Sequence, residues 1–230
     1  MLEIKNNLEA IGLRLRQACA SAGRDPSSVR LLAVSKTFPA QAVAQAHAAG
    51  QVDFGENYIQ EGVDKIRQLA HLPLVWHCIG PIQSNKTRLV AEHFDWVHSI
   101  DRPKIAHRLS EQRSPSCAPL QVCIQVNVDG GPTKAGVAPE QVAELARQIA
   151  TLPGLRLRGI MSIPEPAADF ASALGVHQRA RAVYESLKAQ GFDLDTLSLG
   201  MSADLEAAVH AGSTMVRVGS AIFGARSARA

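Results

Sequence analysis

The stretch LQVCIQVNV, residues 120–128, is apolar at six of its nine positions and shows no strict alternation of apolar and polar residues. Strands with one face in water alternate more cleanly, whereas strands covered on both faces read as nearly continuous apolar runs. The stretch therefore predicts one strand of a parallel sheet that helices cover.

Similar short apolar runs recur along the chain and alternate with segments of helical spacing. We count eight of them, at residues 29–35, 52–54, 74–79, 95–100, 120–128, 155–163, 196–199 and 214–218. The helical segments between them end at typical stop signals, such as Gly50, Pro153–Gly154 and Gly212. Eight strand–helix units predict an α/β protein with a single (β/α)8 TIM barrel domain over residues 1–230.

Two further features bear on the fold. An open doubly wound sheet would place a glycine-rich fingerprint after its first strand, but VSKTFPAQ, residues 34–41, has no glycine. In the opening segment, apolar residues recur every three or four positions: Ile4, Leu8, Ile11, Leu15 and Ala18. This spacing predicts an amphipathic helix over residues 1–22 that packs on the barrel.

Composition narrows the class of protein. Hydrophobic residues make up 46% and charged residues 20%, which is typical of a soluble globular chain. The net charge of +3 comes without a dense basic run, and aromatics are only 4%, so we expect no nucleic-acid partner. No stretch is long enough to span a bilayer, and charges interrupt the opening residues, so we expect a cytoplasmic protein.

The four cysteines, Cys19, Cys78, Cys117 and Cys123, show no CxxC pair and no repeated spacing. We interpret them as reduced, buried thiols and predict no metal site.

The active site of a barrel lies at the carboxyl ends of its strands. Several of the predicted strands end in polar or glycine-rich residues. Each of these residues alone could be an ordinary turn residue or helix cap. The candidate site residues are Lys36, Asn57, His77, Met161, Ser162, Gly200, Met201, Ser202, Arg217, Gly219 and Ser220.

The last two strands give the sharpest signal. Gly200 and Ser202 stand at the entrance of a predicted helix, with Ser202 as its N-cap, and Gly219 and Ser220 repeat the arrangement. Helix starts attract phosphate, and barrel phosphate sites recur after these two strands. The sequence thus predicts a phosphate site, with two ordinary helix caps as the alternative.

Lys36 lies at the end of the first strand, which barrel closure brings beside the eighth. A partly desolvated lysine amine can add to a carbonyl and form a Schiff base. Next to a phosphate site, the carbonyl we expect is an aldehyde that carries a phosphate. The alternative is a solvated loop lysine.

Five stretches resemble the pyridoxal phosphate homeostasis protein family: LLAVSKTFPA, DFGENYIQEGVDKI, WHCIGPIQSNKTR, LRGIMSIP and LSLGMSADLEAAVHAGSTMVRVGSAIFGAR. The resemblance covers nearly the whole chain. It implies a single barrel similar to the N-terminal domain of bacterial alanine racemase, with pyridoxal 5'-phosphate (PLP) bound as an aldimine to a lysine.

The resemblance also implies roles for single residues. Lys36 would carry the aldimine, and Arg217 would approach the pyridine nitrogen. Ser202, Gly219 and Ser220 would hold the phosphate. Asn57 would lie near the ring substituents, with Met161 and Ser162 on the same rim. His77 is either a cofactor residue or a core histidine. Phe38, where many relatives have lysine, departs from the pattern.

Three functions remain open at this stage. The first is a non-catalytic carrier and regulator of PLP that stores, delivers or buffers the cofactor, with PLP-dependent apoenzymes as possible partners. The second is a PLP-dependent racemase or decarboxylase, and the third is an aldolase that uses Lys36 directly. We expect the carrier, because neither Tyr58 nor Tyr184 is clearly placed as the second base of a racemase. We also expect a monomer.

Overall fold

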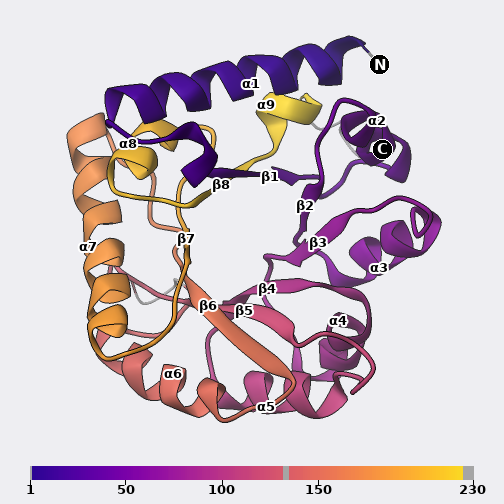
Figure 1. Ribbon diagram of the computed structural model, residues 1–230, viewed down its shortest axis with the longest axis vertical. Coiled ribbons are helices and arrows are strands. Elements are labelled where there is room, and N and C mark those ends of the chain that lie inside the picture. Colours follow the sequence, from indigo (N-terminus) through magenta and orange to yellow (C-terminus); the bar gives the residue numbers. More distant parts are fainter. Residues whose placement is uncertain (1, 132–134, 225–230) are drawn as a thin grey trace.

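Eight parallel strands close into a barrel in the order β1 to β8 (Figure 1), which confirms the predicted TIM barrel. The structure is a computed structural model that describes residues 2–131 and 135–224. The strands are β1 (Arg30–Val34), β2 (Asp53–Glu56), β3 (Val75–Cys78), β4 (Trp96–Ile100), β5 (Leu120–Gln125), β6 (Leu155–Met161), β7 (Thr196–Ser198) and β8 (Met215–Val218).

Helices follow the strands and form the outer layer (Figure 1). They are α2 (Ala40–Ala48), α3 (Ile59–Gln68), α4 (Thr87–His93), α5 (Pro103–Gln112), α6 (Val142–Ala150), α7 (Phe170–Ala189), α8 (Leu205–His210) and α9 (Ser220–Phe223). Gly50 and Gly212 adopt positive φ angles of 96° and 97° just after α2 and α8, as predicted for residues that end helices.

The pairing of β1 with β8 closes the barrel. Its register joins Arg30 to Met215 at one end and Ala33 to Val218 at the other. The chain leaves both strands at the same rim, because paired parallel strands end together. Closure therefore brings the segment that carries Lys36 beside Gly219 and Ser220.

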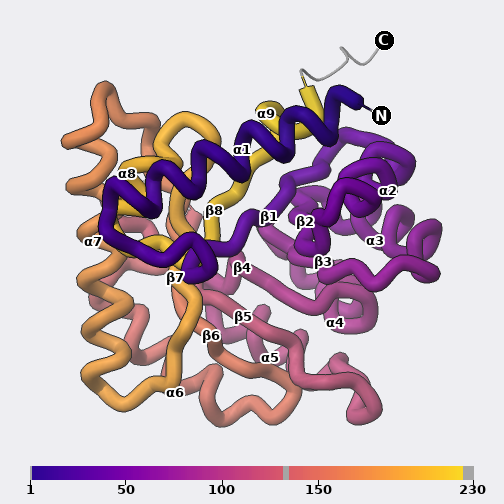
Figure 2. The backbone as a smooth tube through the Cα atoms, turned by 45° about the horizontal axis from the view of Figure 1, so that its top comes forward, coloured from indigo at the N-terminus to yellow at the C-terminus, as the bar shows by residue number. Residues whose placement is uncertain are grey.

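A long first helix, α1 (Leu2–Ser21), crosses the outside of the barrel over α8 and α9 (Figure 2). Its buried residues include Leu8, Ile11, Leu15 and Ala18, four of the five apolar positions predicted to face the barrel. On another face of α1, the guanidinium of Arg14 donates to Glu206 at 2.5 Å and to the Ser202 carbonyl at 2.7 Å. The helix thus packs on the barrel and also contacts the turn before α8.

Two sequence-based predictions need correction. The fifth strand ends at Gln125 and not at residue 128, because the following segment turns aside and Val126 bridges to Val137. Three cysteines are buried as predicted, but Cys117 is exposed on the loop after α5.

None of the helices described is long and apolar enough to cross a membrane.

Gly159 in β6 is the tightest backbone contact of the barrel wall. Its φ is +158°, and a Cβ built on it would lie 1.6 Å from the carbonyl oxygen of Thr196 in β7. No side chain fits there unless the two strands separate. The residue therefore allows β6 and β7 to pair.

We expect Gly159→Ala to lower the free energy of unfolding by about 3 kcal/mol or more, since it forces two paired strands apart. Urea denaturation followed by circular dichroism measures this change. Gly175→Ala is the matched control, because Gly175 lies in α7 with nothing within 4 Å of its built Cβ. The control should be neutral or more stable by about 0.5–1 kcal/mol, as is usual for glycine to alanine in a helix. Equal effects of the two changes would contradict this account.

Candidate functional site

A cavity of about 300 Å³ opens at the carboxyl ends of the strands. It draws on the segments that follow β1, β2, β3, β6, β7 and β8. The lining residues are Val34, Lys36, Phe38, Asn57, Ile79, Ile163, Met201, Ser202, Ala203, Arg217, Gly219 and Ser220. Seven of the eleven candidate residues thus share one cavity: Lys36, Asn57, Met201, Ser202, Arg217, Gly219 and Ser220.

Apart from Met201, the apolar part of the cavity wall was not among the candidates. Val34, Ile79 and Ile163 lie at strand ends beside the polar candidates, and Phe38 stacks on Phe223 with ring centroids 5.2 Å apart. Sequence analysis selected polar strand-end residues, and nothing distinguishes these apolar residues from core ones. Together they give the cavity an apolar side that suits a flat ring.

The turns before α8 and α9 supply another part of the cavity wall. Gly219 and Ser220 stand at the entrance of a helix as predicted, with Gly219 as the N-cap of α9 and Ser220 as its first residue. Ser202, however, is not the N-cap of α8: the helix begins at Leu205 with Asp204 before it. Asp204 takes this place without a side-chain bond to the helix, and its carboxylate instead accepts from the Met201 N–H at 2.7 Å and contacts His177 at 2.9 Å. Ser202 instead lies in the preceding turn and lines the cavity.

Arg217 supplies a positive charge inside the barrel. Its side chain is buried, and its guanidinium donates to Ser198 O at 2.7 Å, Ser198 Oγ at 2.8 Å and Ser162 O at 2.8 Å. All three acceptors are neutral oxygens. Burial lowers the pKa of Arg217 to about 10, so the group stays charged at neutral pH. The cavity floor therefore holds a cation that neutral groups fix in place.

Two buried oxygens of candidate residues, the first in the cavity lining and the second outside it, have no hydrogen-bond partner within the described part of the chain. They are Oδ1 of Asn57 and Oγ of Ser162. Buried polar atoms in folded proteins nearly always have a partner. The Asn57 oxygen, together with Arg217 and the serine-bearing turns, fits a polar ligand with several acceptor and donor groups.

The other candidates surround the cavity without lining it. Gly200 has a φ of +85°, and its carbonyl accepts from the Arg217 N–H at 3.0 Å. Met161 is fully buried and packs with Trp96 and Cys123. Ser162 contacts Arg217 through its carbonyl. These residues support the floor of the cavity.

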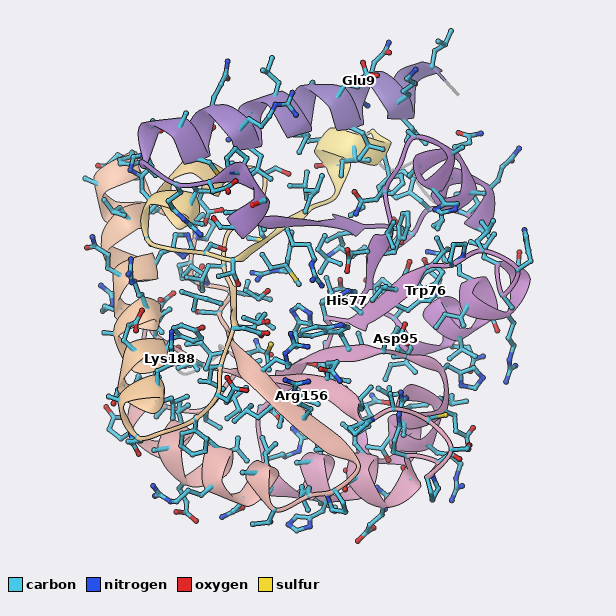
Figure 3. All side chains as sticks on the ribbon, in the orientation of Figure 1. Glu9, Trp76, His77, Asp95, Arg156 and Lys188 are labelled. Carbon is cyan, nitrogen blue, oxygen red and sulfur yellow. The ribbon has the colours of Figure 1, made fainter. Side chains whose placement is uncertain are left out.

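His77 lies within the barrel and does not line the cavity. Along β3 neighbouring side chains point to opposite faces, and Figure 3 shows His77 directed into the ring of strands, with Trp76 on the outer side. His77 is fully buried and stacks on Trp96 with ring centroids 5.3 Å apart. The structure therefore places it as a core histidine with polar partners.

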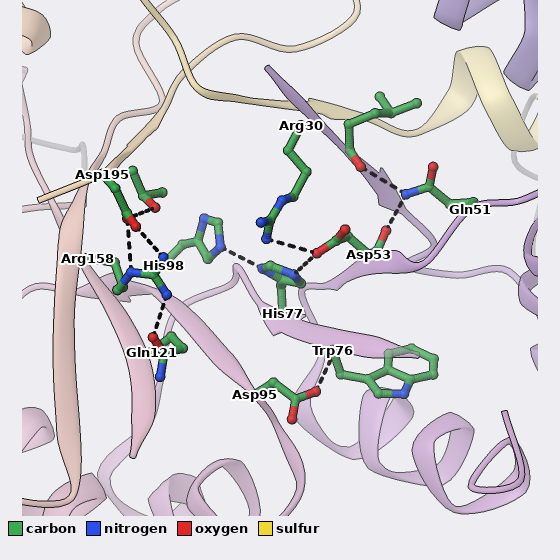
Figure 4. A network of polar contacts seen from close by, with 12 residues as sticks. Arg30, Gln51, Asp53, Trp76, His77, Asp95, His98, Gln121, Arg158 and Asp195 are labelled. Atoms are coloured by element: carbon green, nitrogen blue, oxygen red, sulfur yellow. Dashed lines mark hydrogen bonds and ion pairs between the residues drawn. The ribbon is translucent and has the colours of Figure 1, made fainter. Parts of the chain in front are cut away.

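Those partners form a chain of hydrogen bonds across the barrel interior (Figure 4). Nε2 of His77 lies 3.0 Å from Asp53 Oδ1, and Nδ1 lies 2.9 Å from Nε2 of His98. Nδ1 of His98 lies 3.0 Å from Ser198 Oγ, which also accepts from Arg217. The chain thus joins the amino end of β2 to the cation at the cavity floor.

The charged residues at the two ends of this chain, Asp53 and Arg217, lead independently to the same tautomers of the two histidine rings. A carboxylate only accepts, so neutral His77 donates from Nε2 and accepts at Nδ1, and His98 donates to it from Nε2. An arginine only donates, which leaves the Ser198 hydroxyl hydrogen for Nδ1 of His98. Burial lowers the pKa of both histidines, which favours these neutral forms. Every partner in the chain is then satisfied with no charge on either ring.

Comparison with known proteins shows clear relatives. Residues 6–227 match the family model described as alanine racemase, N-terminal domain. A pyridoxal phosphate homeostasis protein of Pseudomonas aeruginosa is 58% identical over 226 residues, which cover 98% of this chain and 97% of the relative. Another of that name, from Escherichia coli K12, is 52% identical over 229 residues, 98% of either chain.

Solved structures give the same picture. PipY of Synechococcus elongatus, solved with PLP bound, is 38% identical with a TM-score of 0.83, and the match covers 96% of this chain and all of that one. Alanine racemase of Clostridium difficile matches with a TM-score of 0.76 at 14% identity, over 96% of this chain and 56% of the racemase. The second likeness shows a shared fold alone.

We predict that His77 and His98 both carry their proton on Nε2 at pH 7. Nitrogen-15 NMR of the histidine rings distinguishes the tautomers, and His77→Gln and His98→Gln variants assign the signals. Because burial lowers both pKa values, the rings should stay neutral as the pH falls below about 6.5, the usual histidine pKa. A proton on Nδ1 of either ring, or a charged ring at pH 7, would contradict the chain as described.

Proposed function

Because the chain belongs to the pyridoxal phosphate homeostasis protein family, we propose that it binds PLP in the cavity at the strand ends and acts in PLP homeostasis. The observation that carries the proposal is the convergence of Lys36, the serine-bearing turns and buried Arg217 on one cavity of about 300 Å³. PLP supplies an aldehyde, a ring that can accept electron density and a phosphate. The cavity offers a group of matching chemistry for each.

Lys36 is the residue we propose for covalent attachment. It lines the cavity and is half-buried, and a lysine amine is a nucleophile that adds to an aldehyde. Condensation of the Lys36 amine with the PLP aldehyde forms a carbon–nitrogen double bond and releases one water. The bond is reversible, as a protein that delivers its cofactor needs.

Ser202, Gly219 and Ser220 are the residues we propose for the phosphate. The first N–H groups of α9 have no partner within the helix, and Ser202 and Ser220 line the same cavity. Hydrogen bonds to a charged group are worth about 1.5–3 kcal/mol each. Phosphate binding there would retain PLP even while the Lys36 link is open.

Arg217 argues against strong catalysis. Its buried charge would face the pyridine nitrogen and disfavour protonation of that nitrogen, which makes the ring a weaker electron sink. The bonds to Ser198 and Ser162 hold the charge in place. The site then favours holding PLP over the carbanion chemistry of amino-acid enzymes.

The two tyrosines of the sequence also support a carrier. Tyr184 on α7 donates to the Leu194 carbonyl at 2.9 Å, and burial raises its pKa to about 12. Tyr58 is 56% exposed, and neither tyrosine lines the cavity. A racemase needs a second base at its substrate, and neither phenol is placed for that role.

The wider role in the cell forms part of the proposal. A protein that holds PLP reversibly can store, deliver or buffer it, and PLP-dependent apoenzymes are the natural recipients. We include a cytoplasmic location and a monomeric state in the proposal. The names of the curated relatives, which describe homeostasis and no amino-acid reaction, support the carrier over a PLP-dependent racemase or decarboxylase.

Borohydride reduction of the PLP-loaded protein, followed by peptide mass mapping, tests the proposal. We expect the pyridoxyl label on Lys36, and Lys36→Ala should lose the yellow colour yet stay folded, because the side chain is not part of the core. Lys86, which lies at the end of a 3-10 helix outside the cavity, is the internal control.

Pyridoxal without its phosphate gives the second control, and it should label Lys36 far less at equal concentration. A label mainly on another lysine would overturn the role of Lys36. Equal labelling by pyridoxal and PLP would overturn the phosphate site.

A further inference from the structure

The turn that carries Lys36 rests on a cluster of charged residues, buried Glu56 and Lys65 and partly exposed Glu61, which we call the clamp. We propose that the clamp is a positioning device that holds this turn so that the Lys36 side chain enters the cavity. The inference rests on the proposed function, because it concerns the lysine that attaches PLP. Glu56 ends β2, whereas Glu61 and Lys65 lie one turn apart on α3.

Lys65 is the centre of the clamp. Its side chain is only 5% exposed, and its Nζ lies 2.7 Å from each of three oxygens. These are the Ser35 carbonyl, Glu56 Oε1 and Glu61 Oε1. An ammonium group has three hydrogens to donate, so the three contacts use its full capacity.

The two carboxylates reach the backbone and side chains on both sides of Lys36. Oε1 of Glu56, whose side chain is fully buried, also accepts from the Ser35 hydroxyl at 2.6 Å. Oε1 of Glu61 accepts from the Thr37 N–H at 2.6 Å. The residues before and after Lys36 are therefore both tied to the clamp.

The turn needs such a restraint because it is strained. Thr37 has a φ of +70°, the only positive value among the non-glycine residues that the structure describes. This conformation is unfavourable for a residue with a branched Cβ, and it persists only where surrounding contacts enforce it. The Glu61 bond to the Thr37 N–H is a contact of this kind.

The charged cluster is a costly way to obtain stability alone. Buried ion pairs lose hydration, and apolar side chains of similar size often stabilise a fold equally well. Burial raises the pKa of Glu56, which shows this cost, while the neighbouring Lys65 ammonium acts in the opposite direction. What the cluster provides and apolar residues cannot is a set of directed hydrogen bonds to Ser35 and Thr37.

A glycine lets α3 approach closely enough for these contacts. A Cβ on Gly62 would lie 2.7 Å from Phe94 Cζ and 3.2 Å from Glu56 Cβ. The helix that carries Glu61 and Lys65 thus packs directly against the end of β2. The packing of α3 on β2 and the contacts of the clamp both depend on this close approach of Gly62 to the end of β2.

The test compares the rate at which PLP attaches to Lys36 in four proteins: the unchanged chain, Glu61→Ala, the double variant Glu61→Ala with Thr37→Gly, and Asp64→Ala. Absorbance follows attachment, borohydride mass mapping locates it, and circular dichroism checks the fold. Asp64 is the matched control, since it is an exposed carboxylate on the same helix.

We expect Glu61→Ala to slow attachment about tenfold and Asp64→Ala to leave it within twofold. Glycine adopts the Thr37 conformation without strain, so Thr37→Gly should restore most of the rate lost in Glu61→Ala. A merely structural role would lower the folded fraction seen by circular dichroism without slowing attachment in the protein that stays folded. If Glu61→Ala fails to fold, the double variant is expected to regain the fold.

Three results would overturn the inference while leaving the proposed function intact. They are a Glu61→Ala rate equal to that of Asp64→Ala, a slow rate that Thr37→Gly does not restore, and a double variant that does not fold. An unchanged chain that takes up no label on Lys36 would instead contradict the proposed function, and the inference would fall with it.

Discussion

The parallel pairing of β1 with β8 is the constraint on which the site depends. These strands begin 185 residues apart, at Arg30 and Met215, and their register places both carboxyl ends at the same rim of the barrel. Lys36 follows one strand, whereas Arg217 lies in the other and Gly219 follows it. Without closure the lysine and the serine-bearing turns would belong to opposite edges of an open sheet. With closure they line a single cavity.

Polar groups that do not themselves bind the ligand hold Arg217 and the turn at Lys36 in place. The chain from Asp53 through His77, His98 and Ser198 keeps its rings neutral and presents an oxygen to Arg217. The clamp holds the turn at Lys36 through hydrogen bonds to Ser35 and Thr37. A cation held by neutral groups and an amine on a restrained turn suit a site that binds a cofactor firmly.

The sequence predicts the features that depend on local pattern. Apolar runs locate all eight strands, and Gly50 and Gly212 mark helix ends correctly. The N-cap assignment to Ser202 is wrong because the helix begins two residues later than predicted, at Leu205. Asp204 stands at the cap position without a side-chain bond to the helix, and its carboxylate contacts His177 on α7. The hydrogen-bond chain joins residues that lie far apart in sequence, such as His98 and Ser198, and the clamp ties α3 to Ser35 and Thr37 before it. No local pattern encodes such pairings.

The central claim is that this site holds PLP without using it for amino-acid chemistry. The most direct measurement incubates the PLP-loaded protein with a panel of L- and D-amino acids and follows racemisation, decarboxylation and transamination, with Lys36→Ala as the control. The account predicts no sustained turnover above that control. Lysine-dependent turnover on the order of 1 per second or faster, the ordinary range of enzymes, would contradict it.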